Sequence, residues 1–250
     1  MSDRQSQLTN PRPLRIAHRG ASAEKPENTL AAFHRALAHR SDGVELDVHV
    51  TCDGVPVVIH DATLRRLTGA PGRVAATPWY ELRNRRVRGE PIPRLADVLA
   101  RVRRRTIVQI EIKSATAVTP TVRAVRNARA ERRVLFSSLA PGIVLAVRRL
   151  APEIPRMLIS TGRRAVSGLL RQLTALDAVG VCVHHHAVAS ADWVGRFHAH
   201  GFSVWCWTVN HPGAMRRLAE HGVDAIISDD PALLRRTLNS KSRTPKTSPR

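Results

Sequence analysis

Two periods alternate in the pattern of apolar and polar positions along this chain. Short apolar runs rich in β-branched residues, such as TIVQIEIK at residues 106–113, show the two-residue alternation of a strand. Between them, segments such as 95–102 place leucine and valine three or four residues apart, the spacing of an amphipathic helix. The pattern therefore predicts strands and helices in regular succession, which is typical of a parallel sheet.

Eight predicted strands follow this rule. They cover residues 14–17, a run that begins at Gly43, and residues 106–113, 134–138, 157–160, 179–184, 202–209 and 225–228. Eight strand-helix units in 250 residues match the length of a closed (β/α)8 TIM barrel. A doubly wound open sheet is the alternative, but no GxGxxG loop follows the first strand. We expect a flexible leader (1–13), one barrel domain (14–238) and a disordered basic tail (239–250).

The run GVELDVHVTCDGVPVVIHD, at residues 43–61, contains a ninth strand-like segment. Val55–Ile59 follows a turn at Asp53 and Gly54, which is far shorter than the dozen residues that a parallel crossover needs. We therefore predict that this segment is the return arm of a hairpin on the second strand. Residues 61–93 are rich in glycine, proline and arginine, and we expect a small irregular insertion there.

Charged side chains gather where the predicted strands end. His18 and Arg19 follow the first strand, Glu45 and Asp47 share one face of the second, His60 follows the hairpin, and Glu111 and Lys113 end the third. In a barrel these ends meet at one face, where active sites lie. Three neighbouring carboxylates repel one another unless a cation lies among them, and oxygen ligands favour Mg²⁺ or Ca²⁺. Paired histidines suit general acid and base catalysis.

The charge balance invites another interpretation. The formal net charge is +20, from 40 basic and 20 acidic residues. Arginines are scattered over most predicted helices, however, and aromatic residues make up only 4% of the chain, too few for a base-stacking platform. We expect no specific nucleic-acid partner, but a weak attraction to anionic substrates and surfaces.

Cysteines and apolar runs bear on the compartment. Cys52, Cys182 and Cys206 are odd in number and widely spaced, which predicts reduced thiols and neither disulfides nor a thiolate zinc site. No apolar run approaches the ~18 residues of a membrane helix, and the first residues contain no apolar signal segment. The expected location is the cytoplasm.

Six segments of the chain resemble, in order, the motifs of the glycerophosphodiester phosphodiesterase family. They are AHRGASAEKPENTLAAF, GVELDVHVTCDGVPVVIHD, GEPIPRLADVL, IEIK, WTVN and GVDAIISDDP, and they extend from residue 16 to residue 231. The resemblance implies a TIM barrel that hydrolyses glycerophosphodiesters, which are small molecules, to glycerol 3-phosphate and an alcohol. It also implies roles for eight residues: one Ca²⁺ or Mg²⁺ held by Glu45, Asp47 and Glu111, proton transfer by His18 and His60, phosphate binding by Arg19 and Lys113, and a glycerol contact at Trp207.

Several alternatives stay open at this level. The sequence does not assign which of the two histidines is the acid and which is the base. It also leaves open whether the attacking group is a glycerol hydroxyl, which gives a cyclic phosphate, or water. A phospholipase C- or D-like phosphodiesterase acting on intact lipid has similar residues, and a non-catalytic polyanion-binding protein would use the charge alone. Ser138-Leu139 replaces the Ser-Phe that often ends the fourth barrel strand in the family, which concerns the leaving-group side.

Other polar residues have simpler interpretations. His184, His185 and His186 resemble a metal tract, but side chains alternate at a strand end, so we predict that the three do not share one ion. His49 shares a face with Asp47, although a position above the core is favoured. Asp61 either orients His60 by accepting a hydrogen bond or caps the segment that follows.

Overall fold

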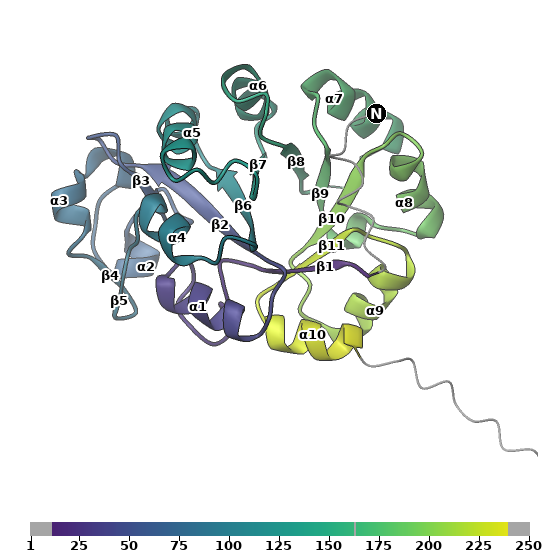
Figure 1. Ribbon diagram of the computed structural model, residues 1–250, viewed down its shortest axis with the longest axis horizontal. Helices are drawn as coiled ribbons and strands as arrows, with labels where there is room; N and C mark the ends of the chain where they lie inside the picture. The colour runs from purple at the N-terminus through teal and green to yellow at the C-terminus, as the bar shows by residue number, and fades with distance from the viewer. Residues whose placement is uncertain (1–11, 163, 240–250) are drawn as a thin grey trace, which may run out of the picture.

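The computed structural model describes residues 12–162 and 164–239, which form a closed (β/α)8 barrel (Figure 1). Eight parallel strands pair in the order β1, β11, β10, β9, β8, β7, β6 and β2, and β2 pairs again with β1 to close the ring. This confirms the TIM-barrel prediction and excludes the open sheet. The strands are β1 (Leu14–Ala17), β2 (Gly43–Val50), β6 (Ile107–Ile112), β7 (Val134–Ser138), β8 (Arg156–Ser160), β9 (Gly180–His184), β10 (Ser203–Trp207) and β11 (Ala225–Ser228).

One helix follows each of these strands in the chain. The helices are α1 (Leu30–Ala38), α4 (Leu95–Arg101), α5 (Val118–Asn127), α6 (Pro141–Leu150), α7 (Val166–Leu176), α8 (Ala191–His198), α9 (Pro212–Glu220) and α10 (Pro231–Asn239). Thr29 caps α1 by accepting a hydrogen bond from the backbone N–H of Ala32. The helices form an outer ring because their apolar faces pack on the outer faces of the strands.

Strand β6 shows how alternation divides the two faces of the barrel wall. Val108, Ile110 and Ile112 point outward into the main core, which they share with apolar residues of α4 and α5. Gln109 and Glu111 point the other way, and Gln109 is buried inside the barrel, where its Nε2 donates to Ser137. The interior of the ring is therefore where polar side chains of this strand meet those of its neighbours.

The predicted hairpin on the second barrel strand is confirmed. β3 (Pro56–Val58) runs antiparallel to β2, with Val58 opposite Val48 and Val57 opposite His49. The two valines of β3 pack in different cores: Val58 packs in the main core and Val57 packs in a smaller one. The hairpin thus joins the barrel to the segment that follows it.

The insertion at residues 61–93 is less irregular than expected. It contains α2 (Arg65–Thr68), a 3₁₀ turn η1 (Val74–Ala76), α3 (Trp79–Leu82) and a hairpin of β4 (Arg86–Val87) and β5 (Glu90–Pro91). Apolar residues spaced too far apart to show a period converge in its own small core: Val57, Ile59, Leu64, Val74, Leu82, Val87 and Ile92. In Figure 1 these elements stand to one side of the barrel.

The remaining expectations concern the ends of the chain and its thiols. Residues 1–11 of the predicted leader and 240–250 of the predicted tail lie outside the described residues. All three cysteines are free thiols, as predicted, and Cys182 and Cys206 are buried. Among the described residues, none of the helices is both long and apolar enough to cross a membrane.

Candidate active site

Three carboxylates come together where β2 and β6 lie side by side. Asp47 is opposite Glu111 in the parallel register, and Glu45 lies two residues earlier on the same face. One oxygen of each of these three side chains lies within 4.8 Å of the others. Glu45 and Asp47 are only 5% and 1% exposed, so water cannot screen the repulsion between them.

Two cations and an amide compensate part of this negative charge. Lys113 donates from Nζ to Glu111 Oε1 at 2.8 Å and to Asp47 Oδ1 at 3.2 Å. Arg19 Nε lies 3.1 Å from Asp47 Oδ2, and Asn28 Nδ2 donates to the same oxygen at 2.8 Å. Burial favours the neutral acid, but Lys113 and Arg19 outweigh it and lower the pKa of Asp47 to about 2.

The pKa of Glu45 is shifted in the opposite direction. Burial, together with the neighbouring charge of Asp47, raises the pKa of Glu45 to about 8. At neutral pH this carboxyl group keeps its proton unless a further positive charge lies beside it. A donor set that contains only oxygen, with one carboxyl group in need of a cation, fits a hard divalent ion such as Ca²⁺ or Mg²⁺.

His18 follows β1 and is held by a residue that follows β11. Its Nδ1 lies 2.6 Å from Asp229 Oδ1, and its Nε2 lies 4.0 Å from Glu45 Oε2. Burial lowers the pKa of His18, but the hydrogen bond to Asp229, together with Glu45 when that carboxyl group is ionised, raises it above the ordinary value. Asp229 also accepts hydrogen bonds from Ser22 and Asn210, which fix its position.

His60 has a carboxylate partner of its own. Its Nδ1 lies 2.6 Å from Asp61 Oδ1, so Asp61 orients the ring. Burial lowers the pKa of His60 by more than Asp47 and Asp61 raise it. His49 does not lie among the carboxylates, because its Nε2 bonds at 3.1 Å to the carbonyl oxygen of His60 and supports the backbone there.

The insertion contributes Arg66, from α2, to this side of the site. Arg66 donates to Asp61 from Nε at 2.6 Å and to Glu27 from Nη2 at 2.9 Å. Glu27 in turn accepts from Arg19 Nη1 at 2.9 Å. A continuous series of polar contacts therefore runs through His60, Asp61, Arg66, Glu27, Arg19 and Asp47.

The backbone around Arg19 is unusual. Arg19 and Asn28 adopt left-handed conformations with φ of 54° and 60°. In this conformation the backbone N–H of Arg19 donates to Glu45 Oε2 at 3.1 Å. Gly20 follows with φ of 84°, and a Cβ atom there would lie 2.6 Å from the carbonyl carbon of Ala32. Strained residues of this kind persist where surrounding contacts determine them, commonly at functional sites.

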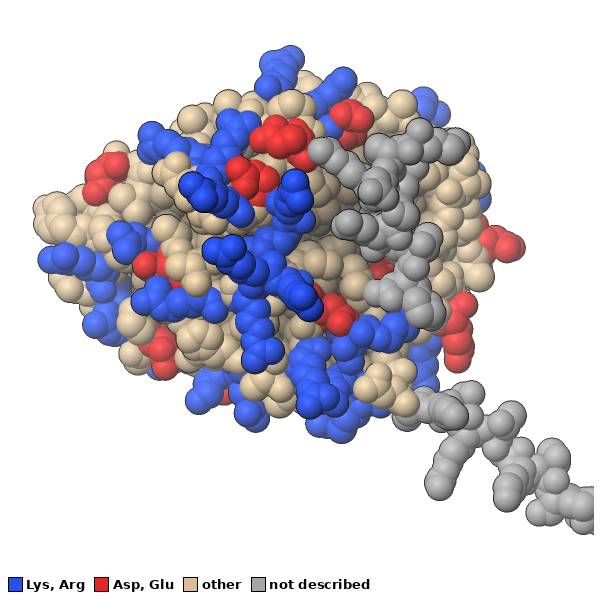
Figure 2. Space-filling model, viewed as in Figure 1, with Lys and Arg blue, Asp and Glu red and all other residues tan. Residues whose placement is uncertain are grey.

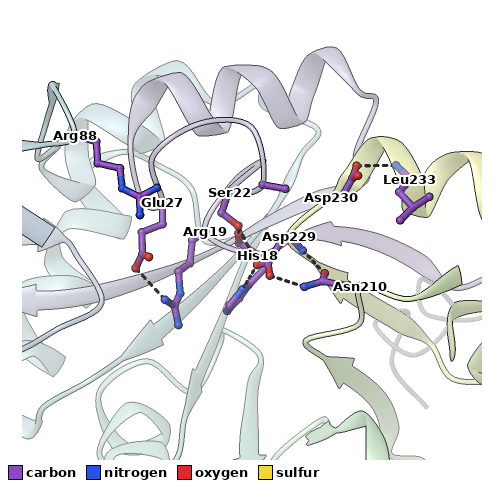
Figure 3. A pocket seen from close by; sticks show the side chains of 10 residues that line it. His18, Arg19, Ser22, Glu27, Arg88, Asn210, Asp229, Asp230 and Leu233 are labelled. Carbon is purple, nitrogen blue, oxygen red and sulfur yellow. Dashed lines mark hydrogen bonds and ion pairs between the residues drawn. The ribbon is translucent and has the colours of Figure 1, made fainter. Parts of the chain in front are cut away.

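A cavity of about 530 Å³ opens beside His18 (Figure 3). His18, Arg19 and Asp229 line it, and Arg88, from the turn between β4 and β5, reaches it next to Glu27. The insertion thus forms part of the wall. A volume in this range suits a small-molecule ligand.

Trp207 ends β10 and is half-buried on another side of the barrel mouth. Its Nε1 donates to the carbonyl oxygen of Cys182 at 3.2 Å, and its ring packs edge-on against His184 with 5.4 Å between centroids. Trp207 is not among the residues that line the cavity beside His18.

The prediction that His184, His185 and His186 face different ways is wrong. β9 ends at His184, and a 3₁₀ turn, η3 (His185–Ala187), follows, so strand alternation does not apply. The ring centroids lie 4.1–5.2 Å apart, and one nitrogen from each ring lies within 4.8 Å of the others.

Sequence reasoning missed three residues that organise the site. Asp229 is recognisable only once the barrel closes, because β11 then lies beside β1. Glu27 and Arg66 lie in no pattern of the sequence that distinguishes them, and Arg66 is one of many arginines in the insertion.

Figure 2 shows how many lysine and arginine side chains cover one face of the molecule.

Comparisons with known proteins agree on one family. A model of the glycerophosphoryl diester phosphodiesterase family matches residues 18–233. A glycerophosphodiester phosphodiesterase from Caldanaerobacter subterraneus subsp. tengcongensis is 32% identical over 243 residues, which cover 88% of this chain and 96% of that protein.

Solved structures extend the similarity to the fold. A phosphodiesterase from Oleispira antarctica, in complex with the product sn-glycerol-3-phosphate, has a TM-score of 0.86 and 28% identity over 92% of this chain and 98% of its own. A glycerophosphodiester phosphodiesterase from Parabacteroides distasonis has a TM-score of 0.81 and 25% identity, with 92% and 98% covered. The range matched by the family model contains every residue of the site described above.

Proposed function

The chain belongs to the glycerophosphoryl diester phosphodiesterase family, and from this premise we propose that it hydrolyses glycerophosphodiesters to glycerol 3-phosphate and an alcohol with a divalent cation and two histidines. The enzyme class is that of a phosphoric diester hydrolase. One observation carries the proposal: both histidines interact with the buried carboxylate cluster, His18 with Glu45 and His60 with Asp47, and each histidine is oriented by a further carboxylate of its own. A relative bound to sn-glycerol-3-phosphate supports the product.

Glu45, Asp47 and Glu111 would hold the ion, Ca²⁺ or Mg²⁺. The chemistry that such an ion supplies is polarisation of a phosphate oxygen and a lower pKa for a hydroxyl group or water beside it. Glu45 keeps a proton at neutral pH, and a bound cation would take the place of that proton.

His18 and His60 are proposed to move protons. In each ring Nδ1 is held by a carboxylate, so Nε2 is the nitrogen available to substrate. One histidine accepts the proton of the attacking hydroxyl group or water as the new P–O bond forms. The other donates a proton to the departing alcohol oxygen as its P–O bond breaks, because an alkoxide is a poor leaving group. The geometry suits either assignment, and either a cyclic phosphate or direct attack by water.

Arg19 and Lys113 are proposed to contact the phosphate. Both side chains already lie at the carboxylates, 2.8–3.2 Å from Asp47 or Glu111, so a phosphate bound there would share them. Their role is to neutralise an anion that would otherwise be repelled by the cluster. Trp207 is proposed to line the glycerol side from the end of β10, and a positively charged surface would attract the anionic substrate.

The three free thiols support a reducing compartment, and we propose the cytoplasm.

The test is release of glycerol 3-phosphate by EDTA-treated protein to which Ca²⁺ or Mg²⁺ is returned. Glycerophosphocholine, glycerophosphoethanolamine and glycerophosphoglycerol form the substrate panel, and intact phospholipid vesicles form the comparison. We expect ion-dependent release from deacylated substrates and little from vesicles. Release from vesicles alone would indicate a phospholipase, and no release with either ion would contradict the proposal.

A further inference from the structure

The three consecutive histidines at the end of β9 form a compact cluster outside the site already described. His184 belongs to the last position of β9, and His185 and His186 to the turn η3. The ring pairs lie 4.8, 5.2 and 4.1 Å apart between centroids, and each ring offers a nitrogen within 4.8 Å of the others. Going round the ring of strands, β9 lies four strands from β2 in either direction, so the strand that leads into the cluster lies across the barrel from β2 (Figure 1).

Nothing among residues 12–162 and 164–239 compensates a charge on these rings. Within that range no carboxylate forms an ion pair with any of the three, unlike His18, His39, His60 and His198. Nδ1 of His185 is buried and has no hydrogen-bond partner among the residues that the structure describes. Three protonated imidazoles so close together would repel one another, so the arrangement favours neutral rings with nitrogen lone pairs available.

We propose that His184, His185 and His186 form a binding site for one divalent transition-metal ion of the zinc class, separate from the carboxylate site. Neutral imidazole nitrogens suit zinc, nickel and copper, whereas Ca²⁺ and Mg²⁺ prefer oxygen. Three protein ligands leave a fourth position open in a tetrahedral zinc site.

The surroundings of the cluster agree with this role. Trp207 packs edge-on against His184 and restricts its ring, while His186 is exposed, so its ring can turn toward the others without displacing a packed side chain. The two sites at the barrel mouth therefore differ in kind: oxygen donors on the β2 and β6 side, and nitrogen donors at the end of β9.

Zinc binding to the full chain tests the proposal, with no histidine tag present. We would strip the protein with EDTA, remove the chelator, and titrate with ZnCl₂ alone and again with excess Ca²⁺, which occupies oxygen ligands but not imidazoles. Calorimetry should show one zinc per wild-type chain that persists in Ca²⁺. H186A should weaken this binding by about tenfold or more, and the triple variant H184N/H185N/H186N should lose it.

A matched control is H34A, which removes an exposed histidine from α1. It should bind zinc like the wild type. A second measurement guards against misfolding of the triple variant: zinc should raise the Tm of the wild-type protein and of H34A, but much less that of H186A. Zinc binding that excess Ca²⁺ displaces, or equal binding in wild type and H186A, would overturn the proposal. The test is independent of phosphodiesterase activity.

Discussion

The two sides of the barrel mouth differ although the strands that build them are alike. Strands β1, β2 and β6 end among charged groups, with the carboxylates of Glu45, Asp47 and Glu111 in contact with Arg19 and Lys113. Opposite them, β8, β9 and β10 end in Ser160, His184 and Trp207. The same fold and the same alternation of faces therefore produce one side that carries carboxylates and cations, and another that carries a hydroxyl, an imidazole and an indole.

Burial imposes a large free-energy cost only on the side with the carboxylates. Removing a charge from water costs several kcal/mol unless opposite charges and hydrogen bonds replace the water. Asp47 has such partners in Lys113, Arg19 and Asn28, while Glu45 does not have enough of them and keeps a proton. The comparison teaches that the proposed catalytic side is the one with incompletely compensated charge, and functional sites commonly concentrate groups with shifted pKa values.

Loss of either histidine that is proposed to move protons should have the largest effect. H18A and H60A should each lower kcat by about 10²–10⁴-fold, the usual contribution of general acid or base catalysis. Release of glycerol 3-phosphate measures it. H186A, on the other side of the mouth, is the matched control and should stay within a few-fold of the wild type. Near-wild-type turnover in H18A or H60A with metal supplied would break the comparison.

Substitution of a carboxylate should affect ion affinity together with rate. E111Q keeps the size of the side chain but removes a charged oxygen ligand, so the ion concentration for half-maximal activity should rise by about 10–100-fold, a range typical of damaged metal sites. Activity is titrated with Ca²⁺ and, separately, with Mg²⁺. An unchanged midpoint in both titrations would remove Glu111 from the proposed metal site.

Stability of the metal-free protein should depend on Glu45. Its folded pKa of about 8 exceeds the ordinary value of 4.5, so the folded state keeps a proton that the unfolded state releases between these values. The free energy of unfolding should therefore fall as pH rises from 4.5 to 8, by at most about 1.4 kcal/mol per pH unit. Thermal melts in EDTA measure this, and E45Q should reduce the slope. Equal slopes in both proteins would show that Glu45 ionises freely.

The smallest expected effect is that of Arg66, which acts through Asp61 on His60. R66A should lower kcat by about 2–5-fold with little change in KM, since exposed ion pairs contribute about 1 kcal/mol or less. R66K should recover part of the loss, and R65A is the matched control because Arg65 is exposed on the same helix. A change in KM without a change in kcat, or an equal decrease of kcat in R65A, would show that Arg66 does not position His60.

Periodicity was sufficient for most of the fold. Short apolar runs, with a two-residue alternation in the second and third, located every barrel strand, and the short turn at Asp53-Gly54 required β3 to run antiparallel. The convergence of Glu45, Asp47 and Glu111 followed from the same alternation, because faces and strand ends are local properties of a parallel sheet.

What the sequence did not reveal depends on contacts between distant segments or on local turns. Asp229 reaches His18 because the first and last strands, β1 and β11, are paired, although the two residues are 211 apart in the chain. The histidine cluster depends on the chain leaving the strand at His184 for a 3₁₀ turn, a change of backbone conformation that alternation does not predict. The small core of the insertion likewise has no period to detect.

That small core has a consequence for how the protein loses activity. His60 stands between two cooperative units, since Val58 packs in the barrel and Val57 in the core of the insertion. A unit with few buried side chains opens more readily than a large one. Amide hydrogens of the insertion are therefore expected to exchange before those of β6 and β7, and heat should inactivate the protein below the temperature at which the barrel itself unfolds.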